Sequence, residues 1–410
     1  MDTQRCPYRL DTVGTDLPAE AVALRALGPA TPVELPGGIP AWSVTDPALI
    51  KRLLTDPRVS KDAQQHWPAY IDGEIAEDWP LRMWIDVRNA LTAYGPEHGR
   101  LRRLISPAFT ARRIRVLTPE IERITAELLD RLADRPQDQI VDLRGEFTWV
   151  LPLMVVNTLL GVPEDLHDAF RACIGRIFDT DATPEEAVRN GEAVYLQLAN
   201  LVEAKRRTPG EDVTSALIQA HDEETGTGLT ERELLDSLLL LIGAGHETTV
   251  NLLGSAIIAL AADAEQLDAV RKDPARWADV VEETLRLRPP VSSILPRFAV
   301  EELHDEATGI TFARGDMLVV NFTAGGRDAA LHGPDADSFD HTRESRREHL
   351  SFGHGTHYCL GAELARLEAR IALAALFDRF PQLTLATAEV KPLESFISDG
   401  PRELPVRLHG

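Results

Sequence analysis

The chain has 410 residues and, with 43 basic against 65 acidic side chains, a formal net charge of −22 at pH 7. So acidic a balance argues against a nucleic-acid-binding surface or a basic membrane-surface patch, because both require positive potential. A hydrophobic content of 44% with 26% charged residues is ordinary for a globular protein and excludes general disorder.

The first elements in the chain are strands. Residues 33–35 and 41–44 flank Pro36-Gly37-Gly38, which predicts a hairpin. Apolar residues at three- and four-residue spacing then predict helices over 119–132 and 187–205. Almost all of the remaining chain has the same helical pattern.

A long helix is predicted to begin at Thr230, where the run Thr-Glu-Arg-Glu to Glu233 forms a capping box. The pattern continues to about Ala262, which gives a helix about 50 Å long. A helix of that length with an apolar midsection must cross the middle of the protein. Its longest uncharged part, 248–262, has 15 residues. That is fewer than the ~18 residues that a membrane span needs.

Two further helices flank a second strand-rich region. The first covers 278–287 and is ended by two prolines, and the second follows Cys359. Between them, strands are expected at 310–312 and 318–322, separated by Arg314-Gly315-Asp316. The predicted class is mainly α with small β-sheets. Because no linker or repeat interrupts the chain, residues 1–410 are expected to form a single domain.

The number and spacing of the cysteines indicate the cellular compartment of the protein. Cys6, Cys173 and Cys359 are far apart, and an odd number of cysteines cannot close a disulfide framework. Residues 1–10 contain no apolar segment of the kind found in signal peptides. We therefore expect a soluble, cytoplasmic protein with reduced thiols, in which Cys6 and Cys173 are buried structural residues.

The segment 351–361 carries the most specific chemistry. Gly353 and Gly355 permit positive φ and a tight loop. Cys359 is expected at the start of the following helix, where the helix dipole and free N–H groups lower the pKa of a thiol. A lone thiolate in such a loop suits a soft axial metal ligand. The alternative is a buried structural cysteine, the usual fate of a single cysteine.

The pattern Phe352-Gly-x-Gly-x-His-x-Cys-x-Gly361 resembles the haem-binding signature of the cytochrome P-450 family, the haem-thiolate monooxygenases, with every signature position filled. The chain looks most similar to soluble actinobacterial members. The resemblance implies a triangular-prism fold, haem b held in part by Phe352, and Cys359 as the proximal iron ligand. Thiolate ligation donates electron density to iron and favours O–O cleavage.

Glu283 and Arg286 lie at i and i+3 of a predicted helix and resemble the family's Glu-x-x-Arg pair. Such a pair on its own is usually a solvated surface pair. Arg343 matches the arginine that joins it in the family. The resemblance implies a buried triad that fixes the architecture behind the haem and has no catalytic role.

Glu247 and Thr248 lie in the middle of the long helix, in the run Ala244-Gly-His-Glu-Thr-Thr249. Thr248 can hydrogen-bond back to the carbonyl of Ala244 and weaken the helix there. Without the cysteine motif, a mildly kinked core helix with a surface glutamate would be favoured. With it, the run resembles the family's oxygen-activation motif. Thr248 would then hydrogen-bond dioxygen and Glu247 would relay protons, while His246 is expected at the pocket edge or in packing.

Four basic residues match the positions that bind the two haem propionates in the family. They are His98 and Arg102, which form a His-x-x-x-Arg element, together with Arg297 and His357. A surface charge is the plain alternative for any one of them. As a set they imply propionate binding, for which arginine is well suited.

The region from His98 to Arg115 contains six arginines and no carboxylate, which is unusual in so acidic a chain. These arginines are Arg100, Arg102, Arg103, Arg112, Arg113 and Arg115. Arg366 and Arg370, on the helix after Cys359, are expected to converge with them on the cysteine side of the haem. The alternative is a solvated charged face. The resemblance implies a docking site for an acidic ferredoxin, supplied with electrons by a ferredoxin reductase.

Substrate contacts are expected before the His98 helix, after the helix 278–287, and near the C-terminus. The residues are Trp67, Trp79, Met83, Trp84, Val291, Ser292, Leu295, Phe396 and Ile397. Simple packing is the alternative reading of the tryptophans.

The implied activity is hydroxylation of a hydrophobic small molecule, macrolide- or polyketide-like or steroid-like, with O2 and electrons from a ferredoxin. The protein is expected to work as a monomer without nucleic-acid or membrane partners. Non-insertion oxidative coupling or rearrangement is an alternative for the same fold. A non-catalytic haem-binding protein would lack the acid–alcohol pair that Glu247 and Thr248 provide.

Overall fold

The computed structural model describes residues 7–177 and 184–409, and the strands within them form three small sheets. The largest sheet has the strand order β1-β2-β3-β9-β6-β4, the second β10-β11-β5, and the third β7-β8. The strands are β1 (Tyr8–Arg9), β2 (Ala30–Leu35), β3 (Ile39–Val44), β4 (Val59–Ser60), β5 (Ile140–Asp142), β6 (Ser293–Ala299), β7 (Leu303–Asp305), β8 (Ile310–Phe312), β9 (Met317–Asn321), β10 (Thr384–Leu385) and β11 (Pro405–Arg407).

The predicted N-terminal hairpin is confirmed. β2 and β3 pair antiparallel, with Val33 opposite Ala41. Gly37 and Gly38, in the connecting turn, have φ angles of 81° and 75°. These values lie in the left-handed region that glycine reaches without steric cost, so the Pro-Gly-Gly run fixes the turn.

The second strand-rich region is also confirmed, but its two runs belong to different sheets. β8 pairs with β7 in a separate two-stranded sheet, whereas β9 lies between β3 and β6 in the largest sheet. The second run ends at Asn321, because Phe322 begins α16 (Phe322–Gly326). The pairing partners come from distant parts of the chain, so the local pattern predicted the strands but not their sheets.

The predicted helices are present with small shifts at their ends. They are α8 (Thr118–Ala133), α11 (Pro184–Arg207), α13 (Glu231–Ala262), α15 (Trp277–Leu287) and α18 (Ala362–Arg379). The capping box of α13 is formed as predicted. The N–H of Glu233 donates to Thr230 Oγ1 at 3.3 Å, and the N–H of Thr230 donates to Glu233 Oε2 at 2.8 Å.

Shorter helices complete the chain between these elements. They are α1 (Leu17–Leu27), α2 (Pro47–Thr55), α3 (Ala63–His66), α4 (Pro68–Ile71), α5 (Met83–Asp86), α6 (Gly95–Ile105), α7 (Ala111–Val116), α9 (Val150–Leu160), α10 (His167–Ile177), α12 (Val213–Gln219), α14 (Ala264–Lys272) and α17 (Ala329–His332). A π-helical turn, Arg144–Thr148, precedes α9. The mainly α class with small sheets is thus confirmed.

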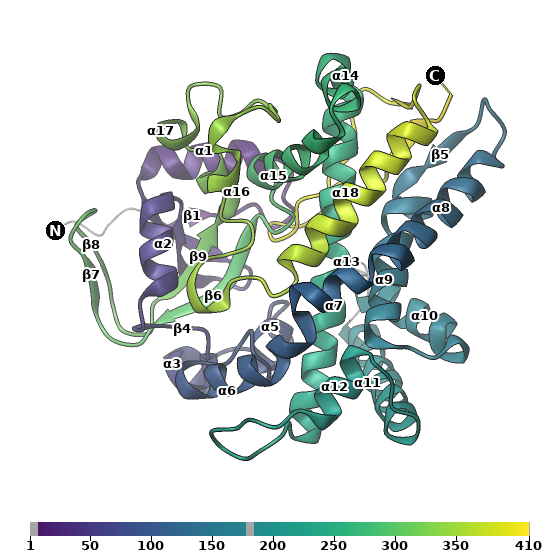
Figure 1. Ribbon diagram of the computed structural model, residues 1–410. Helices are drawn as coiled ribbons and strands as arrows, with labels where there is room; N and C mark the ends of the chain where they lie inside the picture. The colour runs from purple at the N-terminus through teal and green to yellow at the C-terminus, as the bar shows by residue number, and fades with distance from the viewer. Residues whose placement is uncertain (1–6, 178–183, 410) are drawn as a thin grey trace.

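Helix α13 runs through the middle of the molecule, with the largest sheet, the β7-β8 pair and α2 on one side and β5 with α8 to α11 on the other (Figure 1). Its second half packs with α8, α15 and α18 in one hydrophobic core, to which Leu253 and Ile257 belong. Its first half contributes Leu238 and Ile242 to a second core. Both halves of α13 are therefore anchored, and its central residues are held in place between two cores.

Membrane-spanning potential can be judged from the helices of residues 7–177 and 184–409. No single one of them is long and apolar enough to cross a membrane. Only α13 and α14 taken together meet the length and hydropathy requirement, and the chain bends by 106° between them.

Candidate active site

Cys359 lies in the loop that leads into α18. The helix itself begins at Ala362, with Gly361 as its N-cap. The N–H of Cys359 donates to the carbonyl of Phe352 at 2.8 Å, which closes the loop. The next residue, Leu360, packs against the core that contains Leu238 and Ile242 of α13. The cysteine loop therefore joins the same hydrophobic core as the first half of the central helix.

The N–H of Gly361, the N-cap of α18, lowers the pKa of the Cys359 thiol as expected, but the net shift of that pKa is upward. Burial raises the pKa of the thiol, and this outweighs the hydrogen bond from Gly361 N–H and the charges of Arg102 and Arg366, which all lower it. The helix starts three residues after the cysteine, so burial has the largest effect. A metal ion at the sulfur would reverse the balance, because a coordinating thiol is deprotonated.

The four predicted propionate-binding residues are brought together from three separate segments. His98 and Arg102 lie on α6, Arg297 lies on β6, and His357 lies in the cysteine loop. The rings of His98 and His357 have centroids 4.1 Å apart. An Nη of Arg102 donates to the carbonyl of Tyr358 at 2.7 Å, which ties α6 to the cysteine loop.

Within residues 7–177 and 184–409, no carboxylate forms an ion pair with this basic cluster. His98 Nε2 and Arg297 Nη1 are buried and have no hydrogen-bond partner in the described part of the chain. Burial lowers the pKa of His357, and the positive charges of Lys61 and Arg297 and the neighbouring His98 lower it further. Burial likewise lowers the pKa of Arg297 to about 10. The buried basic side chains therefore surround a position that favours an anion.

Lys61 belongs to the same cluster, although it was not among the residues predicted from the sequence to bind the propionates. The residue follows β4 directly and is 2% exposed. Burial lowers the pKa of its ammonium well below the ordinary value, and the charge of Arg297 lowers it further. No local motif marks Lys61, because its neighbours in the cluster all come from other parts of the chain.

The middle of α13 has the hydrogen bonding expected from its sequence. Thr248 Oγ1 donates to the carbonyl of Ala244 at 2.6 Å, and Thr249 Oγ1 donates to the carbonyl of Gly245 at 3.2 Å. His246 is a packing residue: it is buried against Trp149, with its Nε2 2.9 Å from the Trp149 carbonyl oxygen. Packing of His246 on one side of the helix leaves Glu247 and Thr248 on other faces.

Glu247 is the acid of this segment, and its environment favours proton exchange. Burial raises the pKa of its carboxyl above the ordinary value, while the positive charge of Arg144 opposes that rise. Arg144 begins the π-helical turn before α9, and its buried Nε has no hydrogen-bond partner within the described residues. Arg144 is a second neighbour of the site that no sequence pattern indicated.

The predicted triad behind the cysteine loop is confirmed in its geometry. Glu283 and Arg286 are fully buried and joined by two hydrogen bonds of 2.8 Å, and Arg343 Nε donates to Glu283 Oε1 at 3.3 Å. Arg286 also donates to the carbonyls of Gly326 and Ala336. Every charge in the triad is therefore paired, and the group fixes three segments relative to one another.

The predicted substrate-contact residues divide into packing residues and candidates. Trp67 and Trp79 are buried in the core beneath the largest sheet, where Trp67 stacks on Phe298 with ring centroids 5.4 Å apart. This is the packing alternative. Trp84 is 40% exposed, and the side chains of Met83 and Leu295 lie outside the described residues, as do Cys6 and the side chain of Cys173.

The C-terminal candidates lie beside the segment after α15. Ser292 N–H donates to the carbonyl of Ile397 at 2.7 Å, and Val291 bridges to Ser398. The hydroxyl of Ser292 is hydrogen-bonded to Thr323 Oγ1 at 2.8 Å. Phe396 is buried in the core beneath the largest sheet. Val291 and Ile397 are the two residues of this group that are partly exposed, and Ile397 also packs against the core that contains Phe396.

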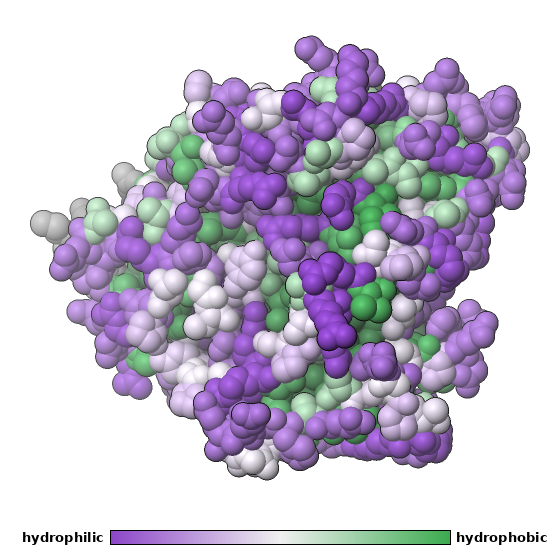
Figure 2. Space-filling view, viewed as in Figure 1, coloured by the Kyte–Doolittle hydropathy of each residue, from purple (hydrophilic) through white to green (hydrophobic). Residues whose placement is uncertain are grey.

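The arginine-rich region is only partly a free cationic surface. Three of its members are neutralised: Arg100 pairs with Glu97 and Glu233, Arg103 with Asp222, and Arg366 with Glu282. The remaining exposed members, for which the described residues provide no carboxylate partner, are Arg112, Arg113, Arg115 and Arg370. Strongly hydrophilic side chains cover α7 in Figure 2, and hydrophobic patches lie beside them.

The predicted haem can be tested against these residues, and they fit it. A Cβ built on Gly361 or on Gly243 of α13 meets no atom within 4 Å, so a flat group can approach both segments closely. The buried basic side chains provide donors for two carboxylates. Cys359 provides one soft ligand. Haem b combines these features: a planar ring, two propionates and an iron that accepts an axial thiolate.

Comparisons with known proteins identify close relatives over the whole chain. The family model for cytochrome P-450 matches residues 277–400. The 2-hydroxy-5-methyl-1-naphthoate 7-hydroxylase of Streptomyces carzinostaticus is 43% identical over 407 residues, which are 99% of this chain and 98% of the relative.

Solved structures agree with this result. CYP154A1 from Streptomyces coelicolor A3(2) has a TM-score of 0.90 at 48% identity and covers 98% of this chain and 100% of its own. Testosterone-bound CYP154C4 from Streptomyces sp. ATCC 11861 has a TM-score of 0.92 at 42% identity, with 99% of both chains covered. The predicted fold, family and haem cofactor are therefore confirmed, and the likeness extends through the sheets as well as the helices.

Proposed function

The chain belongs to the cytochrome P-450 family, and from this premise we propose that it hydroxylates a hydrophobic fused-ring small molecule with Cys359 as the iron ligand. As a member of that family the protein is a monooxygenase and binds haem b. The observation that carries the residue assignment is the cysteine loop itself. It brings a single thiol next to a buried basic cluster for which the described part of the chain provides no carboxylate partner.

Bound haem would supply the one-electron and oxygen chemistry that the protein side chains lack. The chain contributes binding and proton control. Cys359 Sγ would hold the iron, and His98, Arg102, Arg297 and His357 would hold the propionates, with the Phe352 carbonyl fixing the loop. Three segments of the chain, α6, β6 and the cysteine loop, would thereby set the position of the ring.

Protons would be handled by the acid–alcohol pair of α13. Burial raises the pKa of the Glu247 carboxyl, which makes its protonated form easier to reach, so Glu247 would take up a proton and release it toward the site. The Thr248 hydroxyl donates its hydrogen to the Ala244 carbonyl, so its oxygen would be positioned to accept a hydrogen bond from a protonated group in the pocket. The apolar core around α13 would limit entry of bulk water.

The substrate proposal rests on two relatives that are described with a fused-ring substrate or ligand. One is a naphthoate 7-hydroxylase and another has been solved with testosterone bound. Val291 and Ile397 offer this chain's apolar contacts for such a ring system. The test is a difference-spectrum titration with testosterone, 2-hydroxy-5-methyl-1-naphthoate and a macrolide lactone. We expect the ferric haem to shift from low to high spin with a fused-ring compound, and a response to the macrolide alone would contradict the proposal.

The iron ligand has a separate test. The reduced protein with carbon monoxide should give the red-shifted Soret band of thiolate ligation, and Cys359→His should abolish it. A wild-type spectrum of the histidine-ligated kind would overturn the assignment.

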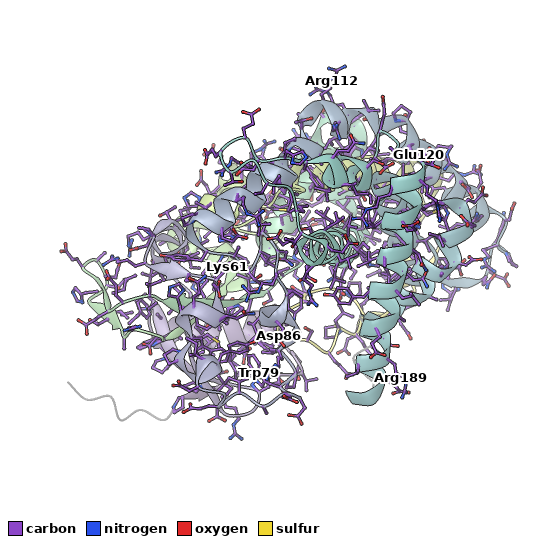
Figure 3. The ribbon with its side chains drawn as sticks, turned by 90° about the horizontal axis from the view of Figure 1, so that it is seen from below. Lys61, Trp79, Asp86, Arg112, Glu120 and Arg189 are labelled. Atoms are coloured by element: carbon purple, nitrogen blue, oxygen red, sulfur yellow. The ribbon has the colours of Figure 1, made fainter. Side chains whose placement is uncertain are left out.

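Electrons are proposed to come from an acidic ferredoxin that docks on the exposed arginines of α7. These arginines lie close to the cysteine loop because α7 packs on α18. Arg112 and Arg189 of α11 lie at opposite ends of the molecule in Figure 3, so Arg189 provides a matched control. We expect Arg112→Glu to slow reduction by ferredoxin and to reduce its dependence on salt, whereas Arg189→Glu should leave both unchanged. Equal effects of the two substitutions would contradict docking on α7.

Oxidative coupling or rearrangement remains the second candidate reaction for this fold. Product analysis with the substrate found by titration separates the two. Hydroxylation adds one oxygen atom from O2 to the substrate, so mass spectrometry after turnover under 18O2 should show its incorporation.

A further inference from the structure

Lys61 carries a buried ammonium for which the described residues provide no partner. The side chain is 2% exposed, and its Nζ has no hydrogen-bond partner among residues 7–177 and 184–409. A buried charge without a counter-ion is strongly unfavourable, so buried lysines are retained only where something compensates them. Lys61 is labelled in Figure 3.

The strand register explains where this lysine lies. β4 pairs antiparallel with β6, with Val59 opposite Ala299 and Ser60 opposite Phe298. Continuing the register by one residue sets Lys61 against Arg297. Two cations directly opposite each other on neighbouring strands repel. The pairing therefore presents a double positive charge, and both side chains have buried donor atoms without partners.

The carboxylate that follows Lys61 in the sequence is already engaged in hydrogen bonds. Both oxygens of Asp62 hold Gln65: Oδ1 accepts from the backbone N–H at 3.1 Å, and Oδ2 accepts from Nε2 at 2.7 Å. Asp62 is thus the N-cap of α3. The groups whose charges act on Lys61, His98 and His357 are other basic residues of the cluster.

Charge balance indicates what completes the cluster. Its permanently or ordinarily cationic members are Lys61, Arg102 and Arg297. Haem would bring two propionate carboxylates, while the charge of a Cys359 thiolate would be offset by the iron itself. The unpartnered Lys61 Nζ and Arg297 Nη1 are the donors that two buried carboxylates require.

We propose that the Lys61 ammonium binds a haem propionate directly, beside Arg297. Lys61 is then a cofactor-binding residue in addition to His98, Arg102, Arg297 and His357. The proposal rests on the proposed haem site, but it concerns only how the propionates are held and leaves the role of Cys359 unchanged.

The experiment compares two porphyrins in the wild type and in Lys61→Met, which keeps the length of the side chain and removes its charge. Holoproteins are prepared with haem b and with its dimethyl ester, in which both carboxylates are uncharged. The rate of haem loss is measured by transfer to excess apomyoglobin. The control is Lys272→Met, which changes an exposed lysine at the end of α14.

With haem b, we expect Lys61→Met to lose the cofactor about tenfold faster or more, as expected for a lost hydrogen bond between charged groups. With the dimethyl ester, Lys61→Met and wild type should lose it at the same rate, since no carboxylate remains to be paired. Lys61→Arg should restore slow loss of haem b. Lys272→Met should match wild type with both porphyrins.

Equal acceleration with both porphyrins would show that Lys61 supports the fold only, and no acceleration with either would show that it does not contact the cofactor. Both results overturn the proposal. If Lys61→Met fails to fold with haem b but folds with the dimethyl ester, that result supports the proposal. If Lys61→Met and Lys61→Gln both fail to fold with either porphyrin, the proposal is overturned. The carbon monoxide spectrum of the wild type reports separately on Cys359, so the two assignments can fail independently.

Discussion

The ion pair of Glu282 provides the sharpest test of the electrostatics behind the cysteine loop. Its carboxylate is buried and accepts hydrogen bonds from His349 Nε2 at 3.0 Å and from Arg366 Nε at 2.6 Å. The guanidinium of Arg366 also lies 4.5 Å from the ring centroid of Phe352, at the start of the loop. Burial raises the pKa of Glu282, but the bonds from His349 and Arg366 outweigh burial and lower it from 4.5 to about 2.

The stabilisation follows from this difference. Each pH unit between the folded and unfolded pKa corresponds to about 1.4 kcal/mol. A pKa of about 2 in place of 4.5 therefore adds about 3 kcal/mol to the free energy of unfolding. Because the folded-state pKa is the lower one, folding favours the ionised carboxylate. The contribution is complete above pH 4.5 and is lost as the pH falls toward 2.

The perturbation is Glu282→Gln, which preserves the shape of the side chain and removes its charge. Near neutral pH, we expect the free energy of unfolding of the variant to be about 3 kcal/mol lower than that of the wild type. Below pH 4.5, this difference should shrink by about 1.4 kcal/mol for each pH unit. The measurement is urea unfolding of the holoprotein, followed by tryptophan fluorescence and the Soret band together. A difference of about 1 kcal/mol or less at neutral pH, the value of an exposed pair, would refute the reasoning. So would a difference that stays constant down to about pH 3.5.

Three further predictions concern the central helix and the triad. Thr248→Val should lower the yield of product per NADPH by about tenfold or more and raise peroxide release, measured in coupled turnover, and full coupling would contradict the role of the hydroxyl. Arg286→Met should cost about 3–5 kcal/mol in urea unfolding, because it leaves Glu283 buried without that partner, whereas a loss under about 1 kcal/mol would show that Arg343 suffices. Gly326→Ala should reduce the yield of holoprotein, measured by the pyridine haemochrome, because the added Cβ would lie 2.0 Å from the Arg286 carbonyl oxygen. The control is Gly191→Ala, whose Cβ meets no atom within 4 Å and which should give the wild-type yield.

Elements specified by neighbouring residues were predicted well. The Pro-Gly-Gly turn, the Thr230 capping box and the glycine-flanked cysteine loop each depend on residues within about one or two turns of chain, so their spacing alone determines the backbone. The back-bonding of Thr248 to Ala244 has the same local origin. A resemblance to a family then placed these local motifs in a common fold, which the relatives bear out.

Features that depend on distant partners were not predictable in the same way. Arg100, Arg103 and Arg366 looked like one free cationic face, yet carboxylates from other segments neutralise them. Trp67 and Trp79 were equally suited to a pocket and to a core, and packing against the sheet decided for the core. Partner choice across the fold depends on packing geometry, and a linear pattern does not contain it.

The sequence by itself determined the chemistry of this protein: a single cysteine in a glycine loop, an acid–alcohol pair in a long helix, and basic residues suited to carboxylates. The tertiary structure decided the environment of each group. It placed Lys61 opposite Arg297 through the β4–β6 register, set Arg144 near Glu247, and raised the pKa of Cys359 by burial. The physical reason is that residue type is fixed along the chain, whereas desolvation and charge–charge interactions depend on which segments pack together.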